Sequence, residues 1–309
     1  MEILEFAEYL NRHYNHNLVI AIGQFDGLHI AHKELVRLIL ESAKLNNYKS
    51  AIITFDPHPD YVLGKEDKNL RVMTIEEKAK MLENFGIDFL IIIKFDKSVY
   101  SLTPKQFIVD YLFTINVKEV VVGSDFIFGK NGSGTGEMIY ELSGRTIKGV
   151  IVPEMKVENE KIGTYKLKKL LKNGEVKEIK KWLGRNFSIM GVVEEGNKIG
   201  RQIGFPTINL SLREDFVDIR KGVYAVNVYY NCRKYLGISN VGNNPSFNFK
   251  NRLSLETYIF DFNEDIYGKL VTIEFVDFIR EEHKFSSREE LVSQIKIDIE
   301  IAKKILGNL

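Results

Sequence analysis

The pattern of apolar residues changes class near residue 183, and this change constrains the fold more than any other feature of the 309-residue chain. From residue 18 to about residue 155, short apolar runs typical of strands alternate with amphipathic runs typical of helices. After residue 184, strand-like runs follow one another with short turns between them, until a last helix-like run. We therefore predict two domains, residues 1–183 and 184–309, a division that the chain length allows.

The first pattern predicts an α/β domain. Strands that alternate with helices form a parallel sheet covered on both faces, so such strands are apolar throughout. Ligands of these sheets bind beyond the carboxyl ends of the strands. One helix between the strands has a recognisable start, with Thr103 as N-cap, Pro104 and then Gln106. The predicted strands are Leu18–Phe25, Ser50–Phe55, Phe89–Phe95, Glu119–Gly123 and Gly149–Val152.

The second pattern predicts a mostly antiparallel β domain. Successive strands with short connections are typical of a barrel or a sandwich, and the pattern alone leaves both open. A last helix is expected from Ser287, with Glu290 as its capping-box partner, to Leu306. The predicted strands are Phe187–Glu194, Gly222–Tyr230, Lys234–Asn240, Leu255–Phe262 and Leu270–Ile279.

Composition excludes several classes of protein. An apolar share of 44% supports real cores, and a net charge of +1 gives no global attraction for nucleic acid or membranes. The single cysteine, Cys232, excludes an intrachain disulfide framework and a cysteine-rich zinc site, and it fits a reducing cytoplasm. We expect a cytoplasmic protein, because residues 1–17 lack the apolar segment of a signal peptide and apolar runs such as 89–93 are far shorter than a membrane span.

The segment from Gly23 to His32 is the clearest candidate site. An apolar run ends in a glycine turn, and a helical pattern follows at once. The first turn of a helix offers free backbone N–H groups and a partial positive charge, and glycines let the backbone approach a ligand closely. His29 and His32 are three residues apart, so they share one helix face. This arrangement predicts a phosphate-binding site.

Residues 156–185 form a basic segment with ten lysines and arginines and four glutamates. Leucines at helical spacing, Leu167, Leu170 and Leu171, predict two short helices broken at Asn173 and Gly174. A solvated charged face is one interpretation of this segment. A basic lid over bound phosphates is the other.

Several motifs together identify a family. They are GQFDGLHIAH at 23–32, TFDPHP at 54–59, GSDFIFGKNGSGT at 123–135 and GRQIGFPTINL at 200–210. In this order and spacing, the chain resembles the bifunctional bacterial riboflavin kinase/FMN adenylyltransferases, also called FAD synthetases. The resemblance implies an α/β nucleotidyltransferase domain of Rossmann-like topology, followed by a six-stranded riboflavin kinase barrel with a C-terminal helix. It also implies ATP-dependent phosphorylation of riboflavin to FMN and adenylylation of FMN to FAD, with release of pyrophosphate.

For the kinase, the resemblance implies one catalytic residue and a set of phosphate-binding residues. Glu256 matches the catalytic base, which would accept the proton of the riboflavin hydroxyl as it attacks ATP. Thr207 and Asn209 match the residues that bind Mg²⁺ and the ATP phosphates, and their oxygen atoms suit that metal. Gly200 and Gly204 would let a loop pass close to the phosphates.

For the adenylyltransferase, the nucleophile is the phosphate of FMN, so we expect catalysis by positioning and charge stabilisation. His29 and His32 are the residues most expected to bind the ATP phosphates. The full set expected for ATP is Gly23, Phe25, Asp26, Gly27, His29, His32, Asp125, Thr164, Lys166 and Lys168. The residues expected to bind flavin in the two domains are Phe55, Pro57, His58 and Arg280.

Two alternatives stay open at the level of sequence. The segment 162–168 departs from the family pattern, with Lys168 in place of an arginine, so the chain could be a riboflavin kinase alone. It could also be a flavin-binding regulator that contacts RNA or protein through the basic segment, although such a binder has no need of Thr207, Asn209 and Glu256. The expected partners are riboflavin, FMN and ATP; neither a membrane nor nucleic acid is expected, and self-association is left open.

Overall fold

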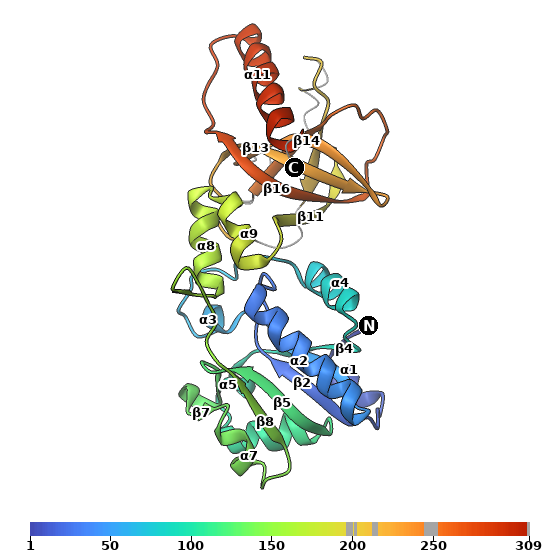
Figure 1. The fold of residues 1–309 in the computed structure, drawn as a ribbon, viewed down its shortest axis with the longest axis vertical. Coiled ribbons are helices and arrows are strands. Elements are labelled where there is room, and N and C mark those ends of the chain that lie inside the picture. Colours follow the sequence, from blue (N-terminus) through green and yellow to red (C-terminus); the bar gives the residue numbers. More distant parts are fainter. Residues whose placement is uncertain (196–199, 201–202, 212–215, 244–252, 308–309) are drawn as a thin grey trace. The chain divides into compact units, whose positions relative to one another are not determined.

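The computed structural model describes residues 1–195, 200, 203–211, 216–243 and 253–307, in two compact units (Figure 1). The first unit comprises Met1–Asn69 and Ile75–Gly163, and the second comprises Leu70–Thr74 and Thr164–Leu309. Contacts therefore group residues 164–183 with the second unit, whereas the change of sequence pattern places them at the end of the first domain. The boundary near residue 183 stays a prediction.

A six-stranded parallel sheet forms the centre of the first unit, in the order β1-β4-β3-β2-β5-β8. The predicted α/β architecture is confirmed. Every residue of β2 is buried, as expected for a central strand covered on both faces. Chain order reverses between β2 and β5, so their carboxyl ends flank the place where such sheets bind ligands. The strands are β1 (Glu2–Glu5), β2 (Leu18–Ile22), β3 (Lys49–Asp56), β4 (Phe89–Lys94), β5 (Val117–Gly123) and β8 (Lys148–Val152).

Helices connect these strands, and the longest, α2, packs on β2, β3 and β5 through Leu35, Val36, Ile39 and Ala43. The N-cap predicted at Thr103 is confirmed, since its hydroxyl accepts the backbone N–H of Gln106 at 3.2 Å; the backbone N–H of Thr103 also donates to the Gln106 side chain at 2.9 Å, which completes a capping box. The helices are α1 (Phe6–Asn11), α2 (Ile30–Asn46), α3 (Pro59–Val62), α4 (Ile75–Phe85), α5 (Lys97–Tyr100), α6 (Pro104–Phe107), η1 (Ile108–Phe113), η2 (Lys130–Gly132) and α7 (Met138–Leu142).

One predicted strand boundary in this region was wrong, and three small elements were missed. The strand predicted to reach Phe25 ends at Ile22, because Phe25 lies in a turn at φ 49°. The edge strand β1 was missed, because only one of its four residues is buried and the apolar signal is correspondingly weak. The beginning of the basic segment forms a hairpin of β9 (Lys156–Val157) and β10 (Glu160–Lys161), and a second small hairpin pairs β6 (Ile127–Phe128) with β7 (Gly134–Thr135).

The two helices predicted in the basic segment are confirmed as α8 (Thr164–Asn173) and α9 (Val176–Leu183). Gly174 separates them at φ 77°, a conformation that suits glycine. The predicted leucines, at positions 167, 170 and 171, are buried. The apolar face of α8 therefore belongs to the core, and its lysines cover the other face.

The second unit is a closed antiparallel barrel in the order β11-β12-β15-β14-β13-β16. The barrel alternative is therefore confirmed over the sandwich. The pattern missed β12, a five-residue strand. The strands are β11 (Phe187–Glu194), β12 (Thr207–Ser211), β13 (Gly222–Tyr230), β14 (Arg233–Asn243), β15 (Leu253–Ile259) and β16 (Leu270–Arg280).

The last helix, α11 (Arg288–Gly307), packs on the outer surface of the barrel against β13, β14 and β16 (Figure 1). Ser287 caps it as predicted, accepting the backbone N–H of Glu290 at 3.2 Å. The shortest bonds to the Glu290 carboxylate come from the N–H and O–H of Ser286, at 2.8 and 2.6 Å, and not from the predicted N-cap. Among the described residues, no helix combines the length and the apolar character that crossing a membrane requires.

Candidate active sites

The turn between β2 and α2 places His29 and His32 side by side. Phe25, Gly27 and Leu28 have positive φ, so the chain reverses sharply after β2. His29 is the N-cap of α2, and its Nδ1 accepts the backbone N–H of His32 at 3.3 Å. The two imidazole rings stack, with centroids 3.6 Å apart and planes 11° apart. The predicted common face is confirmed.

Capping also decides which nitrogen of His29 carries a proton. Because Nδ1 accepts a hydrogen bond, the proton of the neutral ring lies on Nε2, which is then a donor. Burial lowers the pKa of His29 to about 4, against the opposing effect of Asp125. Burial, followed by the charges of His29 and Lys78, lowers the pKa of His32 well below its ordinary value. At neutral pH both rings are uncharged and suited to donate hydrogen bonds.

Lys78 lies beneath this turn, and the sequence analysis missed it. Only 5% of this lysine on α4 is exposed. Its Nζ donates to the carbonyl oxygen of Gln24 at 2.5 Å and to the Thr54 hydroxyl at 3.2 Å. The signal was its spacing: Lys78 precedes the buried Leu82 by four residues, so it occupies the buried face of a helix.

The other predicted residues of the turn have distinct surroundings. Phe25 is fully buried and packs against the His32 ring, with centroids 4.8 Å apart. Asp26 is buried within the turn. Gly27 lies at φ 76°, where glycine is favoured. A side chain at Gly23 would make only ordinary contact with Phe25, so protein packing does not explain that glycine.

The predicted residues of the first unit outside the turn have protein partners. Asp125, at the end of β5, is exposed and pairs with Lys161 at 2.7 Å. His58 caps α3 by accepting the backbone N–H of Asp60 at 3.1 Å, and it follows Pro57 directly. His58 therefore has a structural role as a helix cap, and its contact with flavin stays a prediction.

Four further predicted residues complete the adenylyltransferase and first-unit flavin sets. Phe55, in β3, packs edge-on against Phe95. Thr164, Lys166 and Lys168 lie on α8, which belongs to the second unit. The three residues on α8 are therefore not part of the site that the first unit forms by itself.

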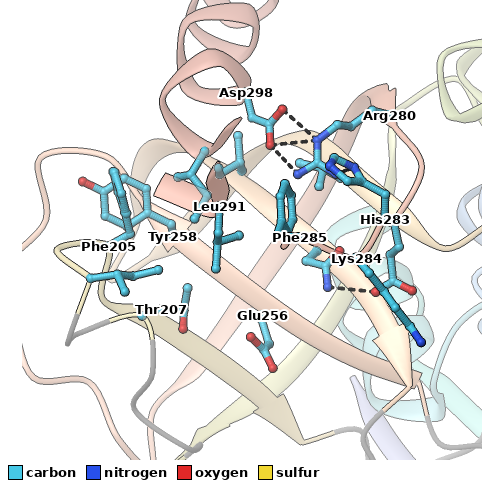
Figure 2. Close-up of a pocket in the computed structure, with 17 residues that line it drawn as sticks. Phe205, Thr207, Glu256, Tyr258, Arg280, His283, Lys284, Phe285, Leu291 and Asp298 are labelled. Carbon is cyan, nitrogen blue, oxygen red and sulfur yellow. Dashed lines mark hydrogen bonds and ion pairs between the residues drawn. The ribbon is translucent and has the colours of Figure 1, made fainter. Parts of the chain in front are cut away.

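A pocket of about 640 Å³ lies between the barrel and α11 (Figure 2). Side chains alternate along β15: Glu256 and Tyr258 line the pocket, while Leu255, Thr257 and Ile259 are buried. The full lining is Gly200, Ile203, Phe205, Thr207, Val223, Ile238, Asn240, Glu256, Tyr258, Arg280, Glu282, His283, Lys284, Phe285, Leu291, Ile295 and Asp298.

Glu256 lies between two neighbouring strands, opposite Asn209 of β12 and Asn240 of β14. Burial raises the pKa of its carboxyl, and the charge of Glu282 raises it further. Glu282 accepts a hydrogen bond from the Asn240 side chain at 3.1 Å. Glu282 is therefore a second carboxylate beside Glu256 in the pocket, and the sequence analysis did not identify it.

The glycines and oxygen donors predicted near Glu256 share this part of the barrel. Thr207 and Asn209 are two apart on β12, so their side chains point to one side, and Thr207 lines the pocket. The side chains of both residues offer hard oxygen atoms as metal ligands. Such ligands suit Mg²⁺, whose remaining ligands would be waters and phosphate oxygens. A Cβ at Gly200 would lie 2.3 Å from the Phe205 carbonyl oxygen, so only glycine fits there, and Gly204 has φ 86°.

Arg280 lines the same pocket, and its guanidinium is held by α11 (Figure 2). It forms a bidentate pair with Asp298, at 2.9 Å from Nε to Oδ1 and 2.8 Å from Nη2 to Oδ2. Asp298 is 1% exposed and also accepts a hydrogen bond from Gln294 at 2.9 Å. Sequence reasoning missed Asp298, although an acid within the apolar run of α11 was the available signal. The predicted contact between Arg280 and flavin stays a prediction.

Comparison with known proteins identifies both halves of the chain. The model of the FAD synthetase family matches residues 11–166, and the model of the riboflavin kinase family matches residues 183–306. Between them the two models cover nearly the whole chain, in the order of the motifs.

Full-length relatives carry both halves. A bifunctional riboflavin kinase/FMN adenylyltransferase of Bacillus subtilis is 37% identical over 94% of this chain and 93% of its own length. One of Listeria monocytogenes is 33% identical over 95% and 94%. A solved structure from Streptococcus pneumoniae, described as a macrolide-efflux protein, has the same fold, with a TM-score of 0.86 and 32% identity over 98% of this chain and 99% of that one. The chain belongs to the bifunctional riboflavin kinase/FMN adenylyltransferase family.

Proposed function

We propose that the histidine turn of the first unit carries the adenylyl transfer and that the pocket of the second unit carries the kinase reaction. The chain is a bifunctional enzyme of flavin cofactor synthesis, which phosphorylates riboflavin to FMN and transfers AMP from ATP to FMN, giving FAD and pyrophosphate. The observation that carries the assignment is the position of Glu256, whose carboxyl has a raised pKa and lines the same large pocket as Thr207.

In the kinase reaction, Glu256 accepts the proton of the riboflavin 5′-hydroxyl while that oxygen attacks the γ-phosphorus of ATP, and ADP leaves as the bond between the γ-phosphorus and the β–γ bridging oxygen breaks. Its raised pKa makes it a stronger base than an exposed carboxylate. Thr207 and Asn209 would hold Mg²⁺, which when bound neutralises charge on the phosphates. Gly200 and Gly204 let the loop before β12 approach the phosphates, because neither has a side chain to obstruct it.

In the adenylyl transfer, the FMN phosphate attacks the α-phosphorus of ATP and pyrophosphate leaves, so no protein nucleophile is needed. The His29 Nε2–H donates a hydrogen bond to a phosphate oxygen, and the backbone N–H groups at the start of α2 add further donors. Gly23, Phe25, Asp26 and Gly27 shape the turn. His32 stacks on His29 and holds its ring in place.

The remaining assignments are proposals to be tested one residue at a time. Asp125, Thr164, Lys166 and Lys168 bind ATP in the adenylyl transfer, while Phe55, Pro57 and His58 bind its flavin. Arg280 binds the flavin of the kinase. Substitution of a true contact raises KM for the corresponding substrate, and substitution of a residue that only stabilises its unit leaves KM unchanged.

We propose a cytoplasmic enzyme, because its co-substrate ATP is made and used there. Riboflavin, FMN and ATP are the substrate class that the family acts on. Nothing in the two reactions requires nucleic acid or self-association. The basic segment therefore has no assigned partner beyond ATP.

One incubation tests the assignment of both reactions. The protein is mixed with riboflavin, ATP and Mg²⁺, and the flavins are separated by chromatography. FMN followed by FAD is expected. FMN alone would favour the kinase-only alternative, and unchanged riboflavin would favour the flavin-binding regulator. Adding EDTA to a parallel sample should stop both products if Mg²⁺ is required.

A further inference from the structure

Lys78 joins three segments beneath the histidine turn. It lies on α4, and its Nζ contacts the carbonyl oxygen of Gln24 in the turn and the hydroxyl of Thr54 at the end of β3. The Thr54 hydroxyl itself donates to the same Gln24 oxygen at 3.1 Å. The Gln24 carbonyl oxygen therefore accepts hydrogen bonds from both Thr54 and Lys78, which ties α4 and the end of β3 to the turn.

A buried ammonium group carries an energetic cost that an apolar side chain of similar length would avoid. Such a group is retained where its charge acts on something nearby. The charge of Lys78 acts on the histidine pair, because it contributes to the low pKa of His32. The other titratable groups around the pair are Asp125 after β5, which acts on His29, and Asp26, buried within the turn.

We propose that Lys78 is a positioning residue of the adenylyl transfer site: it fixes the Gln24 carbonyl, and so the shape of the turn, and places a buried positive charge beneath the bound triphosphate. The charge favours the anionic ligand, because electrostatic interactions are strong where water is excluded. It also opposes protonation of the histidines, so that their donor nitrogens stay fixed. This inference rests on the proposed assignment of adenylyl transfer to the histidine turn.

The test compares three variants of the full chain. Lys78→Met keeps the length and the apolar stem and removes the charge. Lys78→Arg restores a cation. Lys80→Met, at an exposed position of the same helix, is the matched control. FAD formation from FMN gives kcat and KM for ATP, FMN formation from riboflavin reports on the second unit, and NMR titration of the imidazole resonances gives the histidine pKa values.

Lys78→Met should lower kcat/KM for FAD formation by about tenfold or more, which corresponds to about 1.4 kcal/mol of transition-state stabilisation. It should also raise the pKa of His32, and Lys78→Arg should recover part of the activity. The control should stay within about twofold, and FMN formation should be unchanged in all three.

Unchanged FAD formation and unchanged histidine titration in Lys78→Met would overturn the inference. So would a loss that Lys78→Arg does not relieve and that follows only the thermal unfolding of the first unit, since that marks a structural role. A His29→Ala, His32→Ala double variant tests the assignment of adenylyl transfer to the turn separately from the role of Lys78. If this variant keeps full FAD formation, the assignment of the turn itself is wrong; if it loses FAD formation while Lys78→Met does not, only the role of Lys78 is wrong.

Discussion

The candidate site of the first unit is built mainly from one stretch of chain, whereas the pocket of the second unit is built from residues between Gly200 and Asp298. The histidines owe their contact to a helix start and a spacing of three residues. Glu256, Arg280 and Asp298 come together only because a barrel closes and a helix packs on it. The first site depends mainly on local chain geometry, supported by Lys78 and Thr54, and the second depends on closure of the barrel.

The two sites also differ in charge. In both sites burial favours the uncharged form of the side chains. It therefore lowers the pKa of His29 and His32 and raises the pKa of Glu256. In the turn this produces neutral donors for phosphate. In the pocket it produces a carboxylate that is a better base. The same physical cause therefore serves two different reactions.

The largest expected effect is on the base. Glu256→Gln should reduce FMN formation by about 10²–10⁴-fold, because a positioned general base contributes that much. FAD formation from added FMN should be unaffected. Steady-state rates of the two half-reactions measure both effects. Glu264→Gln, at an exposed acid of the same unit, is the matched control, and substantial FMN formation by Glu256→Gln would remove the base from the mechanism.

The next effect separates capping from phosphate binding in the turn. His29→Asn keeps an N-cap side chain, because asparagine is among the preferred N-caps, but it removes the imidazole. FAD formation should fall by about 10²-fold, the scale for loss of one transition-state donor. Thermal unfolding of the first unit should hardly change. His29→Ala should lose the same activity and also about 1 kcal/mol of stability. Full activity in His29→Asn would mean that the histidine only caps the helix.

A third variant tests whether the pocket depends on tertiary packing. Asp298→Asn removes the buried charge that holds Arg280, and it should destabilise the second unit by about 3 kcal/mol, the lower end for breaking a buried pair. KM for riboflavin should rise, while FAD formation from FMN stays unchanged. Calorimetry or denaturant unfolding measures the stability. Glu300→Gln breaks the exposed pair with Lys303 on the same helix and should change stability by less than about 1 kcal/mol; equal effects of the two substitutions would contradict the assigned role of Asp298.

The smallest effect concerns pH. Glu256 acts as a base only when deprotonated, so FMN formation should fall as pH drops through its raised pKa. Glu282→Gln removes a neighbouring negative charge, lowers that pKa and should move the acid limb of the rate profile to lower pH, by about one unit or less. Above about pH 5 the rate of FAD formation should not depend on the protonation of His29, since the pKa of His29 is about 4. A shift of the kinase limb to higher pH would contradict the coupling between the two glutamates.

The sequence predicted correctly those structural features that depend on residues close together in the chain. The N-cap at Thr103 and the helix break at Gly174 depend on residues a few positions apart, and the structure confirms both. The facing of His29 and His32 was predictable for the same reason. The strands β11 and β13 have the predicted bounds, because alternating or continuous burial is visible within each of them.

The pattern of apolar residues could not predict contacts between segments that are far apart in the chain. The short strand β12 is defined by pairing with β11 and β15. The spacing to Leu82 puts Lys78 on the buried face of α4, but its contact with Gln24 is known only from the packing of α4 against the β2–α2 turn. Glu290 lies near two serines, and the geometry of the chain before α11 gives its carboxylate the shortest bonds to Ser286.

The sequence by itself determined the class of each half, the order of the motifs and the family, because these follow from residue identity and short-range periodicity. The tertiary structure decided that Glu282 faces the same pocket as Glu256 and that Asp298 holds Arg280, and it confirmed the barrel that the strand pattern alone had left open. Burial then set the pKa directions of the site residues. These features depend on which surfaces lose water together, and that is determined only when segments far apart in the chain come into contact.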